Sequence, residues 1–473
     1  MSSDTASSSA SSAPADGPGL ARVIGPKLLV FFIIGDILGT SIYALTGSVS
    51  ERVGGALWMP FLLAFVVAFL TAFSYLELVG KYPRAAGAAL YTNRAFKRPF
   101  LTFMVAFTVM CSGITSASSA AQAFGGANLE EILGAIPSWV SYAVVVGFVV
   151  LLAVINVRGV GESVKVNVAL TAVEISGLLV VIVVGVFAVL QGQGDPSRLG
   201  QFRTEPPDAA LFSQPAVLLA ISSATALAFF AMVGFEDSVN MAEETVDPPR
   251  TFPRAMLLAM AVTATIYLVV AVLSSTLVPA DVLADAEDGA LLTVVRTGAP
   301  AFPAVVFAVI TLFAVTNTAL INMMMASRLL YGMARERIIP SPFGRIHTTR
   351  RTPWFSIVVT SAVAVVLVST LDISDLGSMT SLLLLVVFTV VNVAVLVLRR
   401  ERADHRHFRT PTAIPVVAAV LCAFLASPFS GRPVTEYLYA GILLAAGVVL
   451  WVLNRALGRR RGSDDEEPAR LAA

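Results

Sequence analysis

The chain has 473 residues, of which 56% are hydrophobic and only 13% are charged, and its formal net charge is +1. Soluble domains carry about twice this proportion of charge, so the composition excludes a string of soluble domains, although the length would accommodate roughly three. The mean hydropathy of +0.81 and the long apolar runs predict an all-α polytopic membrane protein in a lipid bilayer. We expect no nucleic-acid partner.

Residues 1–20 are rich in Ser, Ala, Gly and Pro, a composition that buries too little apolar surface to order itself. We expect a disordered cytoplasmic tail there, then a transmembrane domain over 21–460 and a second cytoplasmic tail over 461–473. Residues 1–20 also lack the basic region of a signal peptide. The first apolar run is therefore expected to remain as a helix.

Twelve apolar segments approach or exceed the ~20 residues that cross hydrocarbon. They lie at about 28–49, 57–80, 100–124, 139–156, 166–190, 216–245, 253–278, 301–330, 354–370, 375–398, 412–429 and 436–456. A short amphipathic helix is expected at Ala85–Phe96. Twelve transmembrane helices place both termini on the same side.

The basic residues are distributed unevenly between the two sides. If the twelve segments alternate in direction, 27 of the 32 Lys and Arg residues share the side of the termini. The other side has Arg52, Arg198, Arg203, Arg296 and Arg432. Because cytoplasmic loops are enriched in Lys and Arg, we expect a cell-membrane protein with both termini in the cytoplasm.

Two segments contain glycine and polar residues near their middle: Gly-Asp-Ile-Leu-Gly-Thr-Ser at 35–41 and Ala-Met-Val-Gly-Phe-Glu-Asp-Ser at 231–238. Each glycine lowers helix stability by about 1 kcal/mol, so we predict that helices 1 and 6 are discontinuous. A broken helix exposes N–H and C=O groups, which attract a carboxylate and an ammonium respectively. For any single glycine, close helix packing is the alternative explanation.

Helices 1 and 6 correspond if the chain consists of two five-helix repeats, at 28–190 and 216–398, followed by helices 11 and 12 at 412–456. Because five is odd, the second repeat would be inverted relative to the first. Paired interruptions at matching positions of two such halves indicate the binding site of a transporter.

Four motifs resemble those of the amino acid–polyamine–organocation (APC) superfamily. They lie at 35–43 (GDILGTSIY), 75–87 (YLELVGKYPRAAG), 234–254 (GFEDSVNMAEETVDPPRTFPR) and 326–340 (ASRLLYGMARERIIP). The resemblance implies the LeuT-type 5+5 inverted-repeat fold and alternating access, without a cofactor. It implies a secondary transporter, proton-coupled or exchanging, for an amino acid, a polyamine or a related amine such as ethanolamine.

The resemblance and the helix dipoles together suggest a substrate site. Backbone groups of Gly39, Thr40 and Ser41 would bind the carboxylate, and carbonyls of the segment Ala231, Met232 and Gly234 would bind the amine. Phe230 would be an aromatic gate, although core packing explains it equally well. Glu236 would contact the substrate or cap the second half of the broken helix.

Asp36 and Glu174 are candidate proton carriers, because an unpaired carboxylate in hydrocarbon costs at least ~3 kcal/mol and must pair, protonate or face a cavity. A hydrogen bond to a neighbouring helix is the alternative role of each carboxyl. Proton-coupled relatives often have a lysine in the fifth helix, where this chain has Glu174, so a lysine-based mechanism does not transfer. Members of the family as a whole often have a second glycine where this chain has Ser41.

Polar residues of two further helices are candidates for pathway or ion contacts. Ser112, Thr115 and Ser116 line the pathway or mediate small-residue packing. Asn317, Thr318 and Asn322 could ligate Na⁺ as in sodium-coupled proteins of this fold, but we rank sodium below protons or exchange. The two cysteines and three histidines form no metal-binding spacing.

Two other classes of function compete with transport. The sequence has no hydrolase, zinc-protease or nucleotide-binding motif, and no histidine lies in an apolar segment, so we expect no enzymatic activity. A potassium uptake protein or channel on the same scaffold is the stronger alternative. The repeated carbonyl ring of a channel filter is missing from the sequence, but a monovalent cation could occupy the site of the amine.

Overall fold

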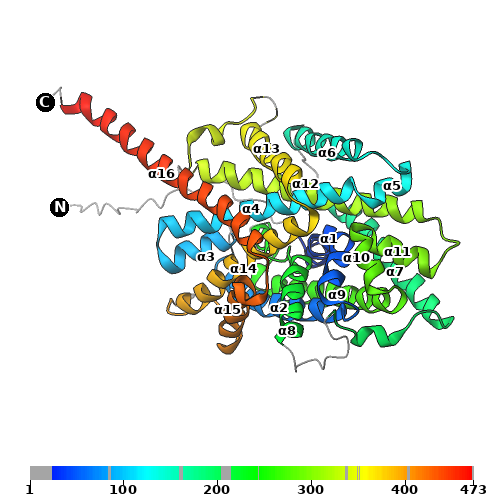
Figure 1. Cartoon of the computed structure of the whole chain (residues 1–473). Helices are drawn as coiled ribbons and strands as arrows, with labels where there is room; N and C mark the ends of the chain where they lie inside the picture. Colours follow the sequence, from blue (N-terminus) through cyan, green and yellow to red (C-terminus); the bar gives the residue numbers. More distant parts are fainter. Residues whose placement is uncertain are drawn as a thin grey trace, which may run out of the picture.

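The computed structural model describes residues 24–83, 87–158, 163–203, 215–242, 244–335, 339–348, 350, 352–401 and 405–470. These residues form helices, joined by turns and by two isolated β-bridges, Ile24–Thr245 and Gly54–Phe202 (Figure 1). The all-α prediction is confirmed for this part of the chain. The predicted tail at 1–20 lies outside the described residues.

The structure has sixteen α-helices in its described part. In chain order they are α1 (Pro26–Val53), α2 (Trp58–Lys81), α3 (Gly87–Phe96), α4 (Pro99–Phe124), α5 (Ala127–Leu133), α6 (Ser138–Arg158), α7 (Ser163–Leu190), α8 (Pro215–Ala228), α9 (Pro248–Leu277), α10 (Ala280–Asp285), α11 (Ala290–Gly298), α12 (Ala304–Arg335), α13 (Trp354–Thr370), α14 (Ile373–Leu398), α15 (Ala413–Ala426) and α16 (Val434–Arg470). Short 3-10 turns are η1 (Pro196–Gly200), η2 (Phe229–Met232), η3 (Asp237–Met241), η4 (Glu287–Gly289), η5 (Ser341–Gly344) and η6 (Pro428–Ser430).

Eleven of the twelve predicted membrane segments each overlap one α-helix, and the sixth, 216–245, overlaps α8 and the turns η2 and η3. Ten helical segments in the described residues are long and apolar enough to cross a bilayer. The other two, α13 and α15, are apolar but shorter. The expected amphipathic helix corresponds to α3, which begins at Gly87; residues 84–86 lie outside the described part.

Local sequence explains several helix starts. Pro26, Pro99 and Pro248 occupy the first turns of α1, α4 and α9, where the missing N–H costs no hydrogen bond. The Asp372 side chain accepts a hydrogen bond from the Asp375 N–H (2.8 Å) and caps α14.

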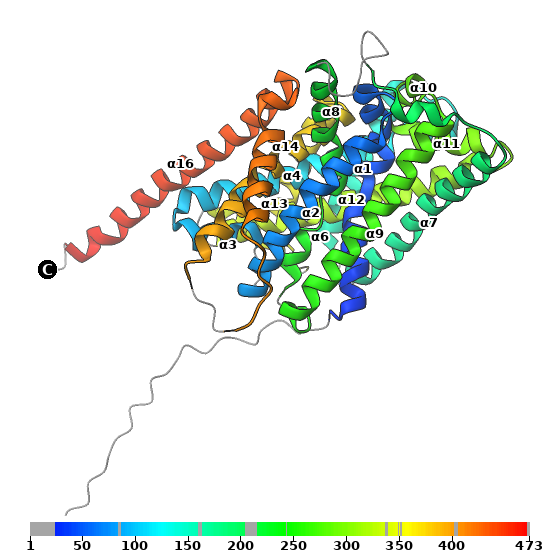
Figure 2. The same ribbon diagram turned by 90° about the horizontal axis from the view of Figure 1, so that it is seen from below.

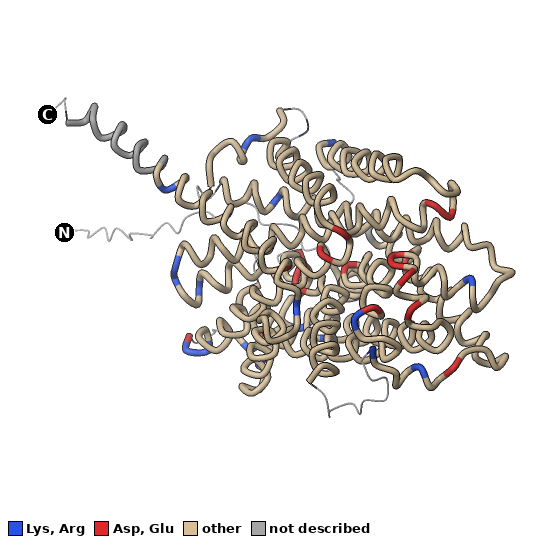
Figure 3. The backbone as a smooth tube through the Cα atoms, in the orientation of Figure 1, with Lys and Arg blue, Asp and Glu red and all other residues tan. Residues whose placement is uncertain are grey.

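The first helix is the centre of the bundle. Of its most apolar stretch, 78% is buried, against 17% for α16, so α1 lies in the protein interior and α16 at its edge. Helices α7, α8, α9 and α12 all contact α1. In Figure 2, α1, α2, α7 and α9 run side by side while α16 leans away from the bundle. Figure 3 shows that charged residues are separated by long uncharged stretches of backbone.

Candidate substrate-binding site

The helix α1 is broken at Gly39, whose backbone angles (φ 14°, ψ −166°) are not helical. The groups released by the break have partners on other helices. The Tyr267 hydroxyl of α9 is within hydrogen-bond distance of the Ile37 carbonyl (2.8 Å) and the Leu38 carbonyl (2.6 Å). The Thr40 N–H donates to the Thr318 hydroxyl of α12 (3.0 Å). The first helix is therefore discontinuous, as predicted.

The sixth apolar segment is also interrupted. Helix α8 ends at Ala228 and passes into η2, after which Val233 is extended and Gly234 has φ +126°, a conformation that favours glycine. The Gly234 N–H donates to the Glu236 carboxyl (2.9 Å), so this acid binds the interrupted backbone directly.

The two breaks are in contact with each other. A Cβ added to Gly234 would lie 2.6 Å from the Asp36 carbonyl oxygen, and one added to Gly39 would lie 2.9 Å from the Thr318 hydroxyl oxygen. A side chain at Gly234 would thus collide with backbone, which cannot move aside easily. Glycine at this position lets the second interruption pack directly on the first.

The predicted substrate residues gather around these breaks. Thr40, Ser41, Phe230, Ala231, Met232 and Glu236 are all buried. A small cavity of about 20 Å³ lies next to the second break. Of the residues predicted to bind substrate, Glu236 lines this cavity, whereas the other seven do not.

The residues expected along the pathway fall into two groups. Ser112 of α4 and Asn322 of α12 line the small cavity together with Asp237 and Thr380. Thr115 instead bonds to the Thr380 hydroxyl (2.6 Å), and Ser116 is buried in the helix packing. Asn322 donates to the Thr318 carbonyl within α12 (3.0 Å).

A second polar cluster lies between α1, α7 and α12. Glu174 of α7 is fully buried, and its carboxyl interacts with the Asn317 side chain of α12. Glu174 and Asp36 are close enough to interact electrostatically, and one Asp36 carboxyl oxygen is buried without a hydrogen-bond partner. The structure therefore brings both candidate acids to the first break.

A wider cavity of about 500 Å³ opens at the end of α1 that follows the break. Its charged lining consists of Glu51, Arg203, Asp285, Glu287, Asp288 and Asp372. Asp288 accepts from the Ala127 N–H at the start of α5 (3.2 Å). Burial raises the pKa of Asp288 to about 7, although this hydrogen bond acts in the opposite direction.

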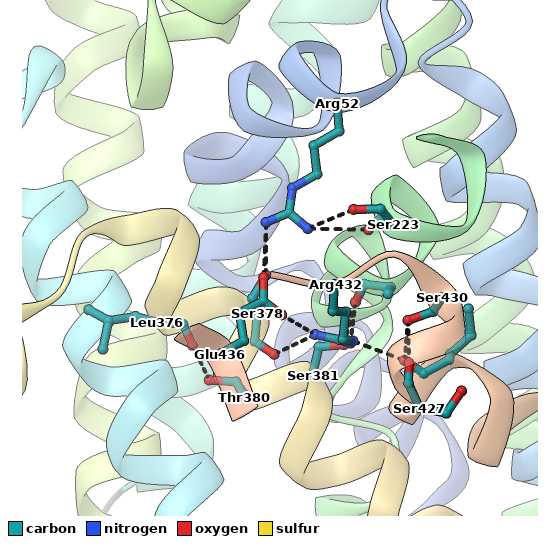
Figure 4. Close-up of polar contacts among 12 residues, drawn as sticks. Arg52, Ser223, Leu376, Ser378, Thr380, Ser381, Ser427, Ser430, Arg432 and Glu436 are labelled. Atoms are coloured by element: carbon teal, nitrogen blue, oxygen red, sulfur yellow. Dashed lines mark hydrogen bonds and ion pairs between the residues drawn. The ribbon is translucent and has the colours of Figure 1, made fainter. Parts of the chain in front are cut away.

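A buried ion-pair network lies at the same end of the bundle (Figure 4). Arg432 and Glu436 are fully buried and paired at 2.9 Å, and Arg52 from the last turn of α1 binds the other Glu436 oxygen at 3.1 Å. Arg432 also donates to the Ala226 carbonyl in the last turn of α8 (2.9 Å) and to the Ser378 carbonyl of α14 (3.0 Å). The network thus joins α16 to α8 and to the part of α1 that follows its break.

Sequence reasoning missed this network and Tyr267. It treated Arg52 and Arg432 only as loop charges, and Tyr267 is a single aromatic residue within an apolar helix. The one local signal was the spacing of Arg432 and Glu436, which lie four residues apart. Arg432 itself precedes α16, which begins at Val434. Nothing local shows that the pair is buried.

Comparison with known proteins agrees with this architecture. A family described as "Amino acid permease" matches residues 24–453. The methylthioribose transporter of Bacillus subtilis is 26% identical over 93% of this chain and 95% of its own length. The branched-chain amino acid permease BcaP of the same organism is 23% identical over 92% and 93% respectively. Cationic amino acid transporter 9 of Arabidopsis thaliana is 28% identical over 70% of this chain and 58% of its own length.

Proposed function

Because this chain belongs to the amino acid permease family, within the APC superfamily, we propose that it is a secondary active transporter for an amino acid or a related amine. The observation that carries this proposal is the contact between the two broken helices, Gly234 on the Asp36 backbone. Two interruptions in contact bring peptide dipoles of opposite sign, outside the regular helical hydrogen-bond pattern, to one point in the bundle.

The broken backbone would bind the two ends of a zwitterion. After Gly39, the outer half of α1 begins with N–H groups that have no partner within the helix, and of these the Thr40 N–H is bonded to Thr318. The neighbouring Ser41 N–H would face the substrate carboxylate. Carbonyls of Ala231, Met232 and Gly234 would accept the ammonium, and Glu236 would add a negative charge on that side.

The proposed architecture has twelve transmembrane helices, with α13 and α15 as the two shorter ones. The first ten form the 5+5 inverted repeat, and both termini lie in the cytoplasm of a cell-membrane protein. In this arrangement the 500 Å³ cavity is the outer vestibule. Alternating access would then move α8, and the half of α1 that follows Gly39, relative to α14.

Proton coupling is assigned to Glu174. Its carboxyl is buried beside the break in α1, and a buried carboxyl gains or loses a proton when its surroundings change between conformations. Asp36 is the second candidate, because it lies at the break itself. A bound proton on either acid would change the charge of the site as the transporter turns over.

Accumulation in proteoliposomes tests this role. Glu174→Gln removes the titrating group but retains its size, so we expect pH-driven accumulation to be lost while counterflow exchange of the same substrate continues. Full pH-driven accumulation by this variant would refute the role of Glu174. Asp36→Asn, measured in parallel, assigns the role between the two acids.

The rival function is uptake of a monovalent cation such as K⁺. A thermal-shift screen of purified protein against amino acids and amines separates the two, because a ligand stabilises the folded state by mass action. We expect stabilisation by an amino acid or amine that is insensitive to K⁺. Stabilisation by K⁺ alone, or competition between K⁺ and the amine, would favour the cation transporter.

A further inference from the structure

The helices α6 and α13 lie side by side (Figure 1), and two hydrogen bonds link them near their ends. At one end, the Thr352 hydroxyl donates to the Val157 carbonyl (2.8 Å). At the other, the hydroxyls of Tyr142 and Ser369 lie 2.8 Å apart. The two helices are antiparallel, because the end of α6 meets the start of α13.

A groove of about 510 Å³ fills the space between these contacts. Its walls are mainly aliphatic, with Val149 on α6 and Ile357 on α13 buried at its base. Ala153 on α6 and Ala362 on α13 are its small lining residues. Val150, Val154 and Val358 are 52%, 42% and 51% exposed, so the groove opens outward from the bundle. In a protein within a bilayer, this opening faces lipid.

The length of the groove corresponds to one leaflet. It runs from Val149 to Val157 along α6 and from Ile357 to Val365 along α13. Eight residues at 1.5 Å each give about 12 Å, while half of the hydrocarbon core is about 15 Å. A single acyl chain lying in the groove would therefore run from the bilayer surface almost to the midplane.

Two arginines lie at one end of this aliphatic groove. Arg158 is the last residue of α6 and Arg350 precedes α13, and both line the groove. Both are exposed, and neither forms an ion pair with another described residue. The groove lining contains no acidic residue. Two unpaired guanidinium groups above an apolar channel are complementary to an anionic head with a hydrocarbon tail.

We propose that the groove between α6 and α13 binds an anionic diacyl phospholipid. One acyl chain lies between Ala153 and Ala362, and the phosphate lies between Arg158 and Arg350. This site is independent of the proposed transport function, since none of its residues belongs to the breaks in helices 1 and 6.

Thermal shift of the detergent-purified full chain tests the site, with dioleoyl phosphatidylglycerol and dioleoyl phosphatidylcholine as probes that share their acyl chains. A basic residue near an anionic surface contributes about fivefold in affinity, so two contribute about thirtyfold. We expect phosphatidylglycerol to be preferred, and Arg158→Gln/Arg350→Gln to reduce that preference by about thirtyfold. Arg254→Gln, another exposed arginine on α9, is the matched control and should retain it.

A second variant tests the groove without changing charge. Ala362→Phe places a ring where the acyl chain is expected, so phosphatidylglycerol binding should fall although both arginines remain. Native mass spectrometry should show one fewer retained phospholipid in Arg158→Gln/Arg350→Gln and in Ala362→Phe than in the unmodified protein. An unchanged lipid preference in the double arginine variant, unchanged binding in Ala362→Phe, or equal stabilisation by inorganic phosphate would each overturn the proposal.

Discussion

Replacing Arg432 with methionine tests how the buried ion pair holds the last turns of α1 and α8 against α16. In the folded protein the Arg432 guanidinium makes hydrogen bonds to Glu436 and Ser381 and to the carbonyls of Leu425, Ser378 and Ala226, at 2.8–3.0 Å. All of these contacts are buried. Methionine has a similar length but donates no hydrogen bond, so its insertion leaves the acceptors without that donor.

The expected loss of stability follows from the burial of the pair. Removing one partner of a buried ion pair costs about 3–5 kcal/mol, because the remaining charge is left without compensation. Glu436 retains Arg52 at 3.1 Å, and the carbonyls of Ala226 and Leu425 retain the hydroxyls of Ser381 and Ser430 as donors. These remaining partners moderate the loss. We therefore expect the unfolding free energy to fall by about 3–5 kcal/mol. With an unfolding entropy of about 2.1 cal/mol/K per residue over 473 residues, this corresponds to a decrease in Tm of about 3–5 °C.

Heat unfolding of the purified protein, followed by tryptophan fluorescence, measures this effect. The control is Arg250→Met, because the Arg250–Asp247 pair is exposed (87% and 49%) and such pairs contribute about 0–1 kcal/mol. The double variant Arg432→Met/Glu436→Met removes both charges and should be less destabilised than the sum of the single variants. The reasoning is refuted if Arg432→Met behaves like Arg250→Met, or if the two single effects simply add.

Two further predictions concern the contact between the breaks and the vestibule. Gly234→Ala forces an unfavourable φ and places a Cβ 2.6 Å from the Asp36 carbonyl, so we expect a loss of about 2–4 kcal/mol and of substrate binding in a thermal-shift assay. Gly147→Ala, where nothing lies within 4 Å, should be neutral, and equal behaviour of the two variants would contradict the packing argument. For Asp288, the folded-state pKa of about 7 exceeds the unfolded value of about 3.9, so the native state binds more protons and its unfolding free energy falls as pH rises from about 4 to 7. Asp288→Asn should remove this decrease, at most about 4 kcal/mol; an unchanged pH profile of stability would show that the carboxyl is ionised throughout.

The sequence alone was sufficient to predict the helices and the positions of the breaks. In hydrocarbon every backbone N–H and C=O group must form a hydrogen bond within its own helix. Each membrane helix therefore appears in the sequence as a long apolar run, which can be recognised without knowledge of the other helices. Glycine and polar residues in the middle of such a run, as at 35–41 and 231–238, conflict with this requirement locally. The breaks at Gly39 and Gly234 were therefore predictable before any contact was known.

Only the tertiary structure determined which side chains form hydrogen bonds with the backbone at the breaks. It also determined which contacts hold the two halves of each broken helix in place. Tyr267 is separated from Leu38 by 229 residues, and Arg52 from Glu436 by 384. A hydrogen bond depends on positions within a few tenths of an ångström, whereas hydropathy assigns a residue only to a segment and a face. An isolated Tyr or Arg in the sequence thus gives no indication of its partner, which is decided by the packing of several helices at once.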